Sequence, residues 1–430
     1  MEPIAIDRLS ALDPEDRSRL LHRAGTLSDE VALVVRQIIQ EVRARGDEAL
    51  REYTRRFDGA TLERLEVTPE EYADALRVVE PGVLRALQVA LDNIERFHRS
   101  HLQPQPVVET QPGVRVWREW RPIERVGVYV PGGRTLYPSS VLMNAVAARV
   151  AGCPEVIVCS PPDRNGLIPA PTLAAASLAG VHRFFKLGGA QAIAAMAYGT
   201  ESVPRTLKLF GAGNPYVTAA KLLVFGDVSI DAPAGPSEIL VIADEGQMPA
   251  LLASDLLAQA EHAPDSAVVL VTPSVTLAEG VAAEVGRQLE ILPLGERAAA
   301  ALASYGRILV ADTLEECIEF SNSYAPEHLE IATAEPEQVL PLITNAGSVF
   351  LGAYAPVAGG DYATGTNHVL PTGGSAKSFG PLSVESFGRW IQVQSVSREG
   401  LMGLRETVVA LAEAEGLQGH ARSIDIRFER

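Results

Sequence analysis

Hydrophobic residues in the first hundred positions recur every three or four residues, which is the period of an amphipathic helix. One such run covers 28–57, begins at a possible N-cap, Ser28, and ends near the Asp58-Gly59 turn. A second run covers 84–97. Nothing in this region has a setting typical of catalysis, so the pattern predicts a helical N-terminal region without a site of its own.

From about residue 121, short β-rich runs alternate with alanine-rich helical stretches. Such alternation predicts parallel sheets with helices on both faces. Two series of this kind indicate an α/β fold of two incomplete Rossmann-like domains, followed by a small helical C-terminal extension. The predicted strands are 125–130, 155–159, 182–187, 205–210, 237–243, 267–272, 306–311 and 347–351, and the predicted helices are 139–150, 171–179, 190–198, 214–224, 249–262 and 276–290.

The domain boundaries expected from these patterns divide the chain into four parts. A helical region, 1–120, is expected to pack on the second Rossmann-like unit. The first Rossmann-like domain covers 121–236, and the second covers 237–378, including a long Gly- and Thr-rich loop at 352–378. We expect the two domains to exchange segments. The extension is 379–430, and its last thirty residues have a helical pattern.

Composition narrows the class of protein. The chain has 430 residues, 47% of them hydrophobic. This length is more than one hydrophobic core usually supports, so we expect two or more domains. A net charge of −17 argues against binding to a nucleic-acid backbone. The N-terminus lacks the apolar segment of a secretory signal, and no apolar run is long enough to span a membrane. The three cysteines show no CxxC spacing, so we expect no disulfide framework and a cytoplasmic location.

The eight histidines fall into two groups. Four have ordinary helical or strand settings and are interpreted as structural or solvated: His22, His98, His101 and His182. Four lie among other polar residues and are candidates for chemistry: His262, His328, His368 and His420.

Two of the polar patches lie in short motifs. In LLAQAEH, Gln259 and His262 are three residues apart and share a helix face, although a histidine that stabilises a helix C-terminus is an equal alternative. In YAPEHLEI, the acid Glu327 adjoins His328, a pair suited to linked proton transfers. For that dipeptide alone, the plain start of a strand is the better interpretation.

The other two patches lie in a glycine-framed loop and in the tail. The loop GGDYATGTNHVLPTGG (359–374) holds Asp361 and His368, and the tail EGLQGH holds Glu415 and His420. Taken singly, each could be solvated surface. Together, two histidines, an aspartate and an amide or carboxylate oxygen form a ligand set without thiolates, which favours zinc or a similar divalent ion. The residues therefore indicate a metal-assisted α/β enzyme.

Dinucleotide binding is only weakly indicated by the residues themselves. The nearest match to the glycine fingerprint, GAGNPY (211–216), has Tyr216 where the third glycine is expected.

The motifs, in their order along nearly the whole chain, resemble the histidinol dehydrogenase family. They are RGDEALREYTRRFDG (45–59), VGVYVPGG (126–133), YPSSVLMNA (137–145), GGAQAIAAMAYGT (188–200), GAGNPYVTAAK (211–221), IDAPAGPSEILVIAD (230–244), LLAQAEH (256–262), YAPEHLEI (324–331), the loop 359–374 and EGLQGHARSI (415–424). Small departures at Ala147, Ala263 and Pro381 remove no functional group.

The resemblance implies a role for each matching residue. Implied zinc ligands are Gln259, His262, Asp361 and His420; the implied acid/base pair is Glu327 and His328; implied NAD contacts are Tyr129, Gln191 and Asn214. Implied substrate contacts are Ser237, His368 and Glu415, together with Gln259, His262, His328, Asp361 and His420.

The resemblance also implies an activity and an assembly. The activity is zinc-dependent oxidation of L-histidinol to L-histidine through L-histidinaldehyde, with two NAD reduced, at the end of histidine biosynthesis. The assembly is a homodimer in which the C-terminal segment is exchanged and completes the partner's site. The alternatives are a zinc/NAD dehydrogenase of a related amino alcohol, a non-catalytic relative, and an aldehyde step through a thiohemiacetal on Cys153, Cys159 or Cys317.

Overall fold

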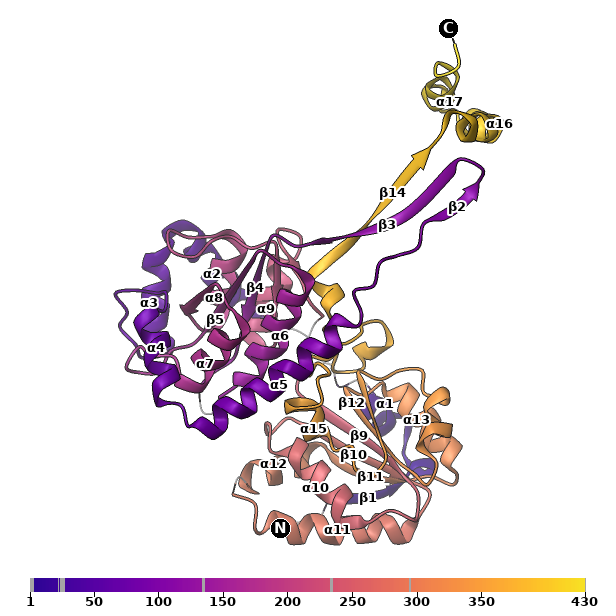
Figure 1. Ribbon diagram of the computed structural model, residues 1–430. Coiled ribbons are helices and arrows are strands. Elements are labelled where there is room, and N and C mark those ends of the chain that lie inside the picture. The colour runs from indigo at the N-terminus through magenta and orange to yellow at the C-terminus, as the bar shows by residue number, and fades with distance from the viewer. Residues whose placement is uncertain are drawn as a thin grey trace.

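The computed structural model describes residues 4–21, 23, 28–133, 136–232, 235–293 and 295–429. Two α/β lobes lie next to each other, and a long arm leaves the first lobe and carries the C-terminus away from both (Figure 1). His22, predicted to be structural or solvated, lies outside the described residues. Within the described part of the chain, no helix is long and apolar enough to cross a membrane.

The first lobe is built on a five-stranded parallel sheet of order β6-β5-β4-β7-β8. Alternate strand residues enter two cores: Val126 and Val158 pack with α6 and α7 on one face, and Ile157 and Leu209 pack with α8 and α9 on the other. Burial on both faces explains the nearly continuous apolar strands. The elements are β4 (Arg125–Tyr129), α6 (Pro138–Ala151), β5 (Glu155–Ser160), α7 (Ala170–Ala179), β6 (Arg183–Lys186), α8 (Gly189–Tyr198), β7 (Lys208–Phe210), α9 (Pro215–Val224) and β8 (Ser229–Ile230).

The second lobe is built on a six-stranded parallel sheet of order β1-β11-β10-β9-β12-β13. Helices α10 to α12 cover one face, and α1 and α13 cover the other. The elements are β1 (Ala5–Arg8), η1 (Leu9–Ala11), α1 (Pro14–Leu21), β9 (Glu238–Ala243), α10 (Pro249–Ala260), β10 (Ala267–Thr272), α11 (Val275–Leu289), α12 (Gly295–Tyr305), β11 (Gly306–Val310), α13 (Leu314–Tyr324), β12 (His328–Ala332), α14 (Pro336–Val339), η2 (Leu340–Leu342), β13 (Ser348–Leu351), α15 (Val357–Tyr362) and η3 (Ser375–Lys377). The α/β fold with parallel sheets is confirmed.

The N-terminal region divides between the lobes, which corrects the prediction that it packs on the second one. Only β1 and α1 join the six-stranded sheet. Helices α2 (Asp29–Arg45), α3 (Asp47–Phe57), α4 (Pro69–Val78) and α5 (Pro81–Arg99) pack on the first lobe, where their apolar faces enter its two cores. The single helix predicted over 28–57 is also wrong: Gly46, with a φ of 52°, ends α2, and Glu201 binds the backbone N–H of Asp47 at 2.8 Å.

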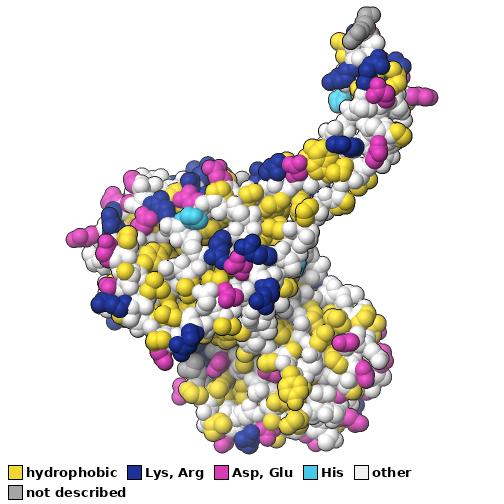
Figure 2. Space-filling model, in the orientation of Figure 1, with side chains coloured by type: hydrophobic (Ala, Val, Ile, Leu, Met, Phe, Trp, Pro, Cys, Tyr) yellow, Lys and Arg dark blue, Asp and Glu magenta, His cyan; other side chains and the backbone are white. Residues whose placement is uncertain are grey.

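The arm is an antiparallel sheet that the sequence did not predict. Strand β3 (Val114–Pro122) pairs with β2 (Val108–Gln111) and, along its whole length, with β14 (Gly388–Val396), which follows η4 (Val384–Phe387). Helices α16 (Arg398–Ala414) and α17 (Gln418–Asp425) end the arm and project into solvent (Figures 1 and 2). They bury only Gly400, Ala412 and Ala421.

Candidate active site

Glu327 and His328 lie at the start of β12, next to the start of β9. The chain reaches them through Ala325, which ends α13 with a φ of 53°, a left-handed conformation that is strained for a residue with a side chain. Gly347 lies so close to this segment that a β-carbon on it would stand 2.5 Å from the carbonyl oxygen of Glu327. The sharp turn thus fixes the backbone of Glu327 and of His328, the first residue of β12.

Hydrogen bonds hold the Glu327 carboxylate in one orientation. Its Oε2 accepts from the Ser237 hydroxyl and from the backbone N–H of Glu238, both at 2.8 Å. The Ser237 hydroxyl in turn accepts from the Gln259 side-chain amide at 2.6 Å. This leaves the amide oxygen of Gln259 buried and, among the described residues, without a partner. A buried polar atom of this kind indicates a place for a ligand.

His328 has its tautomer set by the backbone. Nδ1 lies 3.0 Å from the carbonyl oxygen of Glu238, which can only accept, so Nδ1 carries the proton and the neutral ring has its lone pair on Nε2. Nε2 lies 3.7 Å from Asp361 Oδ1. Burial lowers the His328 pKa, but the carboxylates of Glu327 and Asp361 outweigh it and raise that pKa to about 10.

Asp361, in α15, lies between two histidines. Its Oδ2 is 4.0 Å from His262 Nε2, and its Oδ1 faces His328. His262 follows the end of α10, because that helix stops at Ala260 and not at the predicted residue 262. The structure therefore brings together six predicted site residues from four segments: Ser237, Gln259, His262, Glu327, His328 and Asp361.

His368 links this cluster to the first lobe. Its Nδ1 donates to the carbonyl oxygen of Asp361 at 3.0 Å, so its Nε2 accepts from the Ser140 hydroxyl of α6, also at 3.0 Å. Burial lowers the pKa of His368, in agreement with a neutral ring. The strands β9 and β12 begin at the amino edge of the six-stranded sheet. The contact between His368 and Ser140 thus places this edge opposite the first turn of α6.

The predicted NAD contacts lie together at the carboxyl edge of the five-stranded sheet. Tyr129 ends β4, and its hydroxyl accepts from the backbone N–H of Gly189 at 3.1 Å. Gln191, in the first turn of α8, is buried, and neither its oxygen nor its nitrogen has a partner within the described ranges. Asn214 caps α9 by accepting from Tyr216 and Val217. Doubly wound sheets bind ligands at this edge.

Glu415 and His420 do not reach the cluster within one chain. Both are exposed, at the end of α16 and in α17, at the far end of the arm (Figure 1). Accordingly, no group of three or more His, Cys, Asp or Glu side chains in the described segments is placed to hold a metal ion.

His98, His182 and the three cysteines have structural settings, whereas His101 is exposed. His98 is buried, with its Nε2 3.5 Å from the amide nitrogen of Asn367, and burial lowers its pKa to about 4. His182 Nδ1 accepts from the backbone of Val156 at 3.2 Å. Burial raises the pKa of Cys153 to about 11 and that of Cys317 to about 12, so neither is a thiolate near neutral pH, and burial raises the pKa of Cys159 as well. The thiohemiacetal alternative has no support from these settings.

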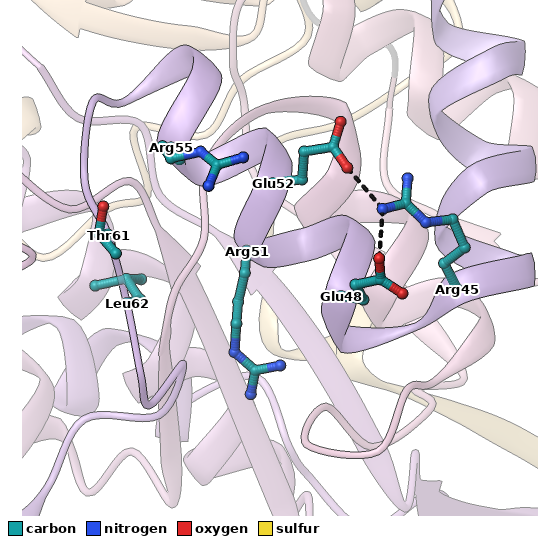
Figure 3. Close-up of a pocket in the computed structure, with 7 residues that line it drawn as sticks. All are labelled: Arg45, Glu48, Arg51, Glu52, Arg55, Thr61 and Leu62. Carbon is teal, nitrogen blue, oxygen red and sulfur yellow. Dashed lines mark hydrogen bonds and ion pairs between the residues drawn. The ribbon is translucent and has the colours of Figure 1, made fainter.

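A surface pocket on α3 and the loop after it is separate from the cluster. It is lined by Arg45, Glu48, Arg51, Glu52, Arg55, Thr61 and Leu62, none of them a predicted site residue (Figure 3). Glu48 and Glu52 both accept from Arg45, at 2.9 and 2.6 Å. Because both glutamates of the pocket are paired with Arg45 and no polar side-chain atom of its described lining is buried without a partner, we assign the pocket no ligand.

Comparison with known proteins decides the family. The histidinol dehydrogenase family model matches residues 21–428. The chain belongs to the histidinol dehydrogenase family. It is therefore an oxidoreductase of histidine biosynthesis.

Relatives cover the chain almost completely. Histidinol dehydrogenase from Methanosarcina mazei is 49% identical over 423 residues, which are 98% of this chain and 97% of the relative. The histidinol dehydrogenase of Methanothermobacter thermautotrophicus is 48% identical over 98% of this chain and 99% of its own. The crystal structure of histidinol dehydrogenase from Elizabethkingia anophelis has a TM-score of 0.96 at 40% identity and covers 100% of this chain and 99% of that one.

This member of the histidinol dehydrogenase family has an ion pair at the site that the sequence did not single out, between the buried Glu238 and the half-buried Arg23. Glu238 receives both guanidinium arms of Arg23, at 2.6 and 2.7 Å, and the backbone N–H of Glu327 at 3.2 Å. Arg23 also lies over the Tyr324 ring, 3.3 Å from its centroid. An arginine in a stretch without periodicity gives no signal of burial. Glu238 lies in the predicted strand 237–243, whose other residues are mostly apolar, so the strand pattern did not single it out.

Replacing Arg23 with methionine should lower the free energy of unfolding by about 3–5 kcal/mol, because it leaves the Glu238 carboxylate buried without its cation. The side chains are 11% and 2% exposed, so solvent screens the pair little. Urea unfolding followed by circular dichroism measures the change. The double variant Arg23→Met/Glu238→Gln is the control and should recover part of the loss; a single variant within 1 kcal/mol of the unchanged protein would contradict the expectation.

Proposed function

We propose that this chain oxidises L-histidinol to L-histidine through L-histidinaldehyde, with two NAD reduced and with a zinc ion in the site. The observation that carries the proposal is the position of His328. Its Nε2 has no hydrogen-bond partner in the described part of the chain and faces Asp361, while the neighbouring Glu327 is held by Ser237 and Glu238. Two side chains that can accept protons, His328 and Glu327, therefore lie side by side, as two successive oxidations at one carbon require.

Three side chains support a zinc site. Gln259 has a buried amide oxygen without a partner, and its nitrogen, bonded to Ser237, fixes the direction of that oxygen. His262 Nε2 and Asp361 Oδ2 lie 4.0 Å apart. Nitrogen and oxygen donors of these types fit zinc. A zinc ion bound by Gln259, His262 and Asp361, with His420 as the fourth ligand, would orient the nitrogen atoms of the substrate and offset the negative charge that raises the His328 pKa.

The chain's own residues then move the protons. In the first oxidation, His328 Nε2 takes the hydroxyl proton of the alcohol as a hydride leaves its carbon. In the second, Glu327 takes a proton from the water that adds to the aldehyde while His328 gives its proton to the carbonyl oxygen. His328 then takes a hydroxyl proton of the resulting hydrate as the second hydride leaves. NAD, when bound, would supply the hydride acceptor for both oxidations. His368, kept neutral by burial, and Glu415 contact the substrate in this proposal.

Tyr129, Gln191 and Asn214 are proposed to bind NAD at the carboxyl edge of the five-stranded sheet. The unpartnered amide of Gln191 supports this role, because an amide with 1% exposure loses hydrogen bonds to water and needs replacements. The contact of His368 with Ser140 brings the cluster next to this lobe.

A homodimer is proposed to complete the site, with Glu415 and His420 supplied by the second subunit. Supporting this, apolar side chains in the arm's helices and at the ends of α17 are exposed: Met402 by 46%, Leu411 by 60%, Leu417 by 43% and Ile426 by 53%. Apolar surface of this kind is typical of an interface. We also propose a cytoplasmic location, since all three cysteines are free, as in reducing compartments.

The purified protein should form two NADH for each L-histidinol consumed, and removing the metal with a chelator should abolish turnover until zinc is returned. Absorbance at the NADH band and metal analysis of the same samples measure both. Related amino alcohols serve as comparison substrates. A yield of one NADH, a preference for another amino alcohol, or full activity after complete loss of metal would each contradict the proposal.

A further inference from the structure

Within the described residues, the five-stranded sheet has the strand order of a dinucleotide-binding domain that lacks its sixth strand. Counted along the chain from β4, its order β6-β5-β4-β7-β8 is 3-2-1-4-5. In such sheets an acid near the end of the second strand binds the adenosine ribose of NAD. Here the second strand is β5, and it ends in Ser160-Pro161-Pro162. The first acid after it, Asp163, is occupied by its own turn, where it accepts from the backbone of Asn165 and Leu167, both at 2.9 Å.

Another acid occupies this place from a different part of the chain. Asp58 follows α3, and its carboxylate reaches the edge where β5 and β6 end. A β-carbon on Gly188 would lie 2.7 Å from Pro161 Cβ and 3.2 Å from Asp58 Oδ1, so all three residues meet at one point. Glycine at 188 permits this close approach. Asp58 also interacts electrostatically with Tyr129 at the end of β4.

The Asp58 carboxylate is incompletely satisfied. Its Oδ2 is buried and has no hydrogen-bond partner in the described ranges, and burial raises the pKa of Asp58 to about 6. Gln191, whose amide is unpartnered at both atoms, lies at the same edge: its Oε1 would be 2.7 Å from a β-carbon on Gly189. Asp58 and Gln191 thus lie against neighbouring glycines, and buried polar atoms without partners are costly unless a polar ligand satisfies them.

We propose that Asp58 accepts hydrogen bonds from the adenosine ribose hydroxyls of NAD and excludes the 2′-phosphate of NADP. This rests on the proposed use of NAD. A ribose 2′-hydroxyl donates to the carboxylate, whereas a 2′-phosphate repels it at a site that burial keeps poorly screened. Lys186, which ends β6, is paired with Glu71 at 2.5 Å and so is not available to offset the phosphate.

The test uses the full chain with ADP-ribose and 2′-phospho-ADP-ribose, whose binding is measured by calorimetry at pH 7.5. Asp58→Asn should weaken ADP-ribose binding about 10-fold and reduce its preference over the 2′-phosphate form by at least about 10-fold, the range of one charge-assisted hydrogen bond. Asp163→Asn, the matched control, should leave both affinities unchanged. Unchanged affinities in Asp58→Asn, or the loss appearing in Asp163→Asn instead, would overturn the inference.

The unchanged protein provides a second decisive result. Preference for 2′-phospho-ADP-ribose, or no binding of either probe, would overturn the inference. The first outcome would favour Arg164, whose Cγ would lie 3.6 Å from a β-carbon on Gly59. Neither probe undergoes hydride transfer, so failure of histidinol oxidation with intact ADP-ribose binding would count against the proposed function alone.

Stability separates a binding role from a folding role. Because the pKa of Asp58 is raised to about 6 from 3.8, the folded chain holds this proton more tightly than the unfolded chain. The ionised carboxylate therefore destabilises the fold above about pH 6, and this effect disappears below about pH 4. As the pH rises from about 4 to about 6, the melting temperature of Asp58→Asn should increase relative to that of the unchanged protein. A lower melting temperature of the variant at pH 7.5 would assign the loss of binding to misfolding.

Discussion

Replacing His328 with asparagine should slow both oxidations by roughly 10²–10⁴-fold, because one imidazole is proposed to take a proton in each of them. Asparagine retains a donor toward the Glu238 carbonyl, which His328 Nδ1 now contacts at 3.0 Å, but has no base in place of Nε2. Stopped-flow measurement of NADH formation, started once from L-histidinol and once from L-histidinaldehyde, gives the two rates separately.

Glu327→Gln is the informative companion variant. The amide can still accept from Ser237 and the Glu238 backbone, so the geometry should survive, but it cannot take a proton from water. Aldehyde oxidation should therefore fall far more than alcohol oxidation. His101→Asn, an exposed histidine on the first lobe, is the control and should leave both rates unchanged. Equal, small losses in the His328 and Glu327 variants would refute the division of roles.

Two inactive variants should restore activity when combined in one dimer. His262→Asn damages the lobe side of the proposed metal site, and His420→Asn damages the arm. If each site takes its lobe from one subunit and its arm from the other, a mixed dimer contains one site with both defects and one with neither. Mixed dimers isolated through two different affinity tags should then show about half of the normal activity and zinc content, as two-fold symmetry requires.

The matched control combines two lobe defects. A mixed dimer of His262→Asn and Asp361→Asn has a damaged lobe at both sites and should remain inactive. Each parent dimer should also have little activity and little zinc. If the His262/His420 mixed dimer is no more active than its parents, the arm does not serve a neighbouring subunit, and the proposed shared site is wrong.

The parallel sheets could be predicted because their strands carry a strong local signal. Runs such as EILVIA at β9 are buried on both faces and are apolar without interruption, and each is followed by an alanine-rich helix. The arm gave a weaker signal: VRVWREWRP at β3 alternates polar and apolar residues, but its partner β14 lies far along the chain. Hydrophobic periodicity continues across Gly46, which is why two helices were predicted as one.

The site could be predicted residue by residue, but its arrangement could not. His328 is both the first residue of a strand and a neighbour of Asp361, so the plain structural interpretation of YAPEHLEI and the chemical one are compatible. The position of the cluster at the amino ends of β9 and β12 departs from the usual carboxyl-edge location. Arg23, Glu238 and Asp58 were missed because their importance comes from burial, which no local pattern records. The ligand roles remain predictions.

The pairing of β3 with β14 constrains the order in which the molecule assembles. Pro122 pairs with Gly388 and Val114 with Val396, so the arm cannot close until the ribosome has released nearly all of the chain. Both lobes have their strands and helices available earlier and can form first. Helices α16 and α17 are therefore positioned last, and any catalytic residue that they deliver to a neighbouring subunit arrives after translation, when two finished chains meet.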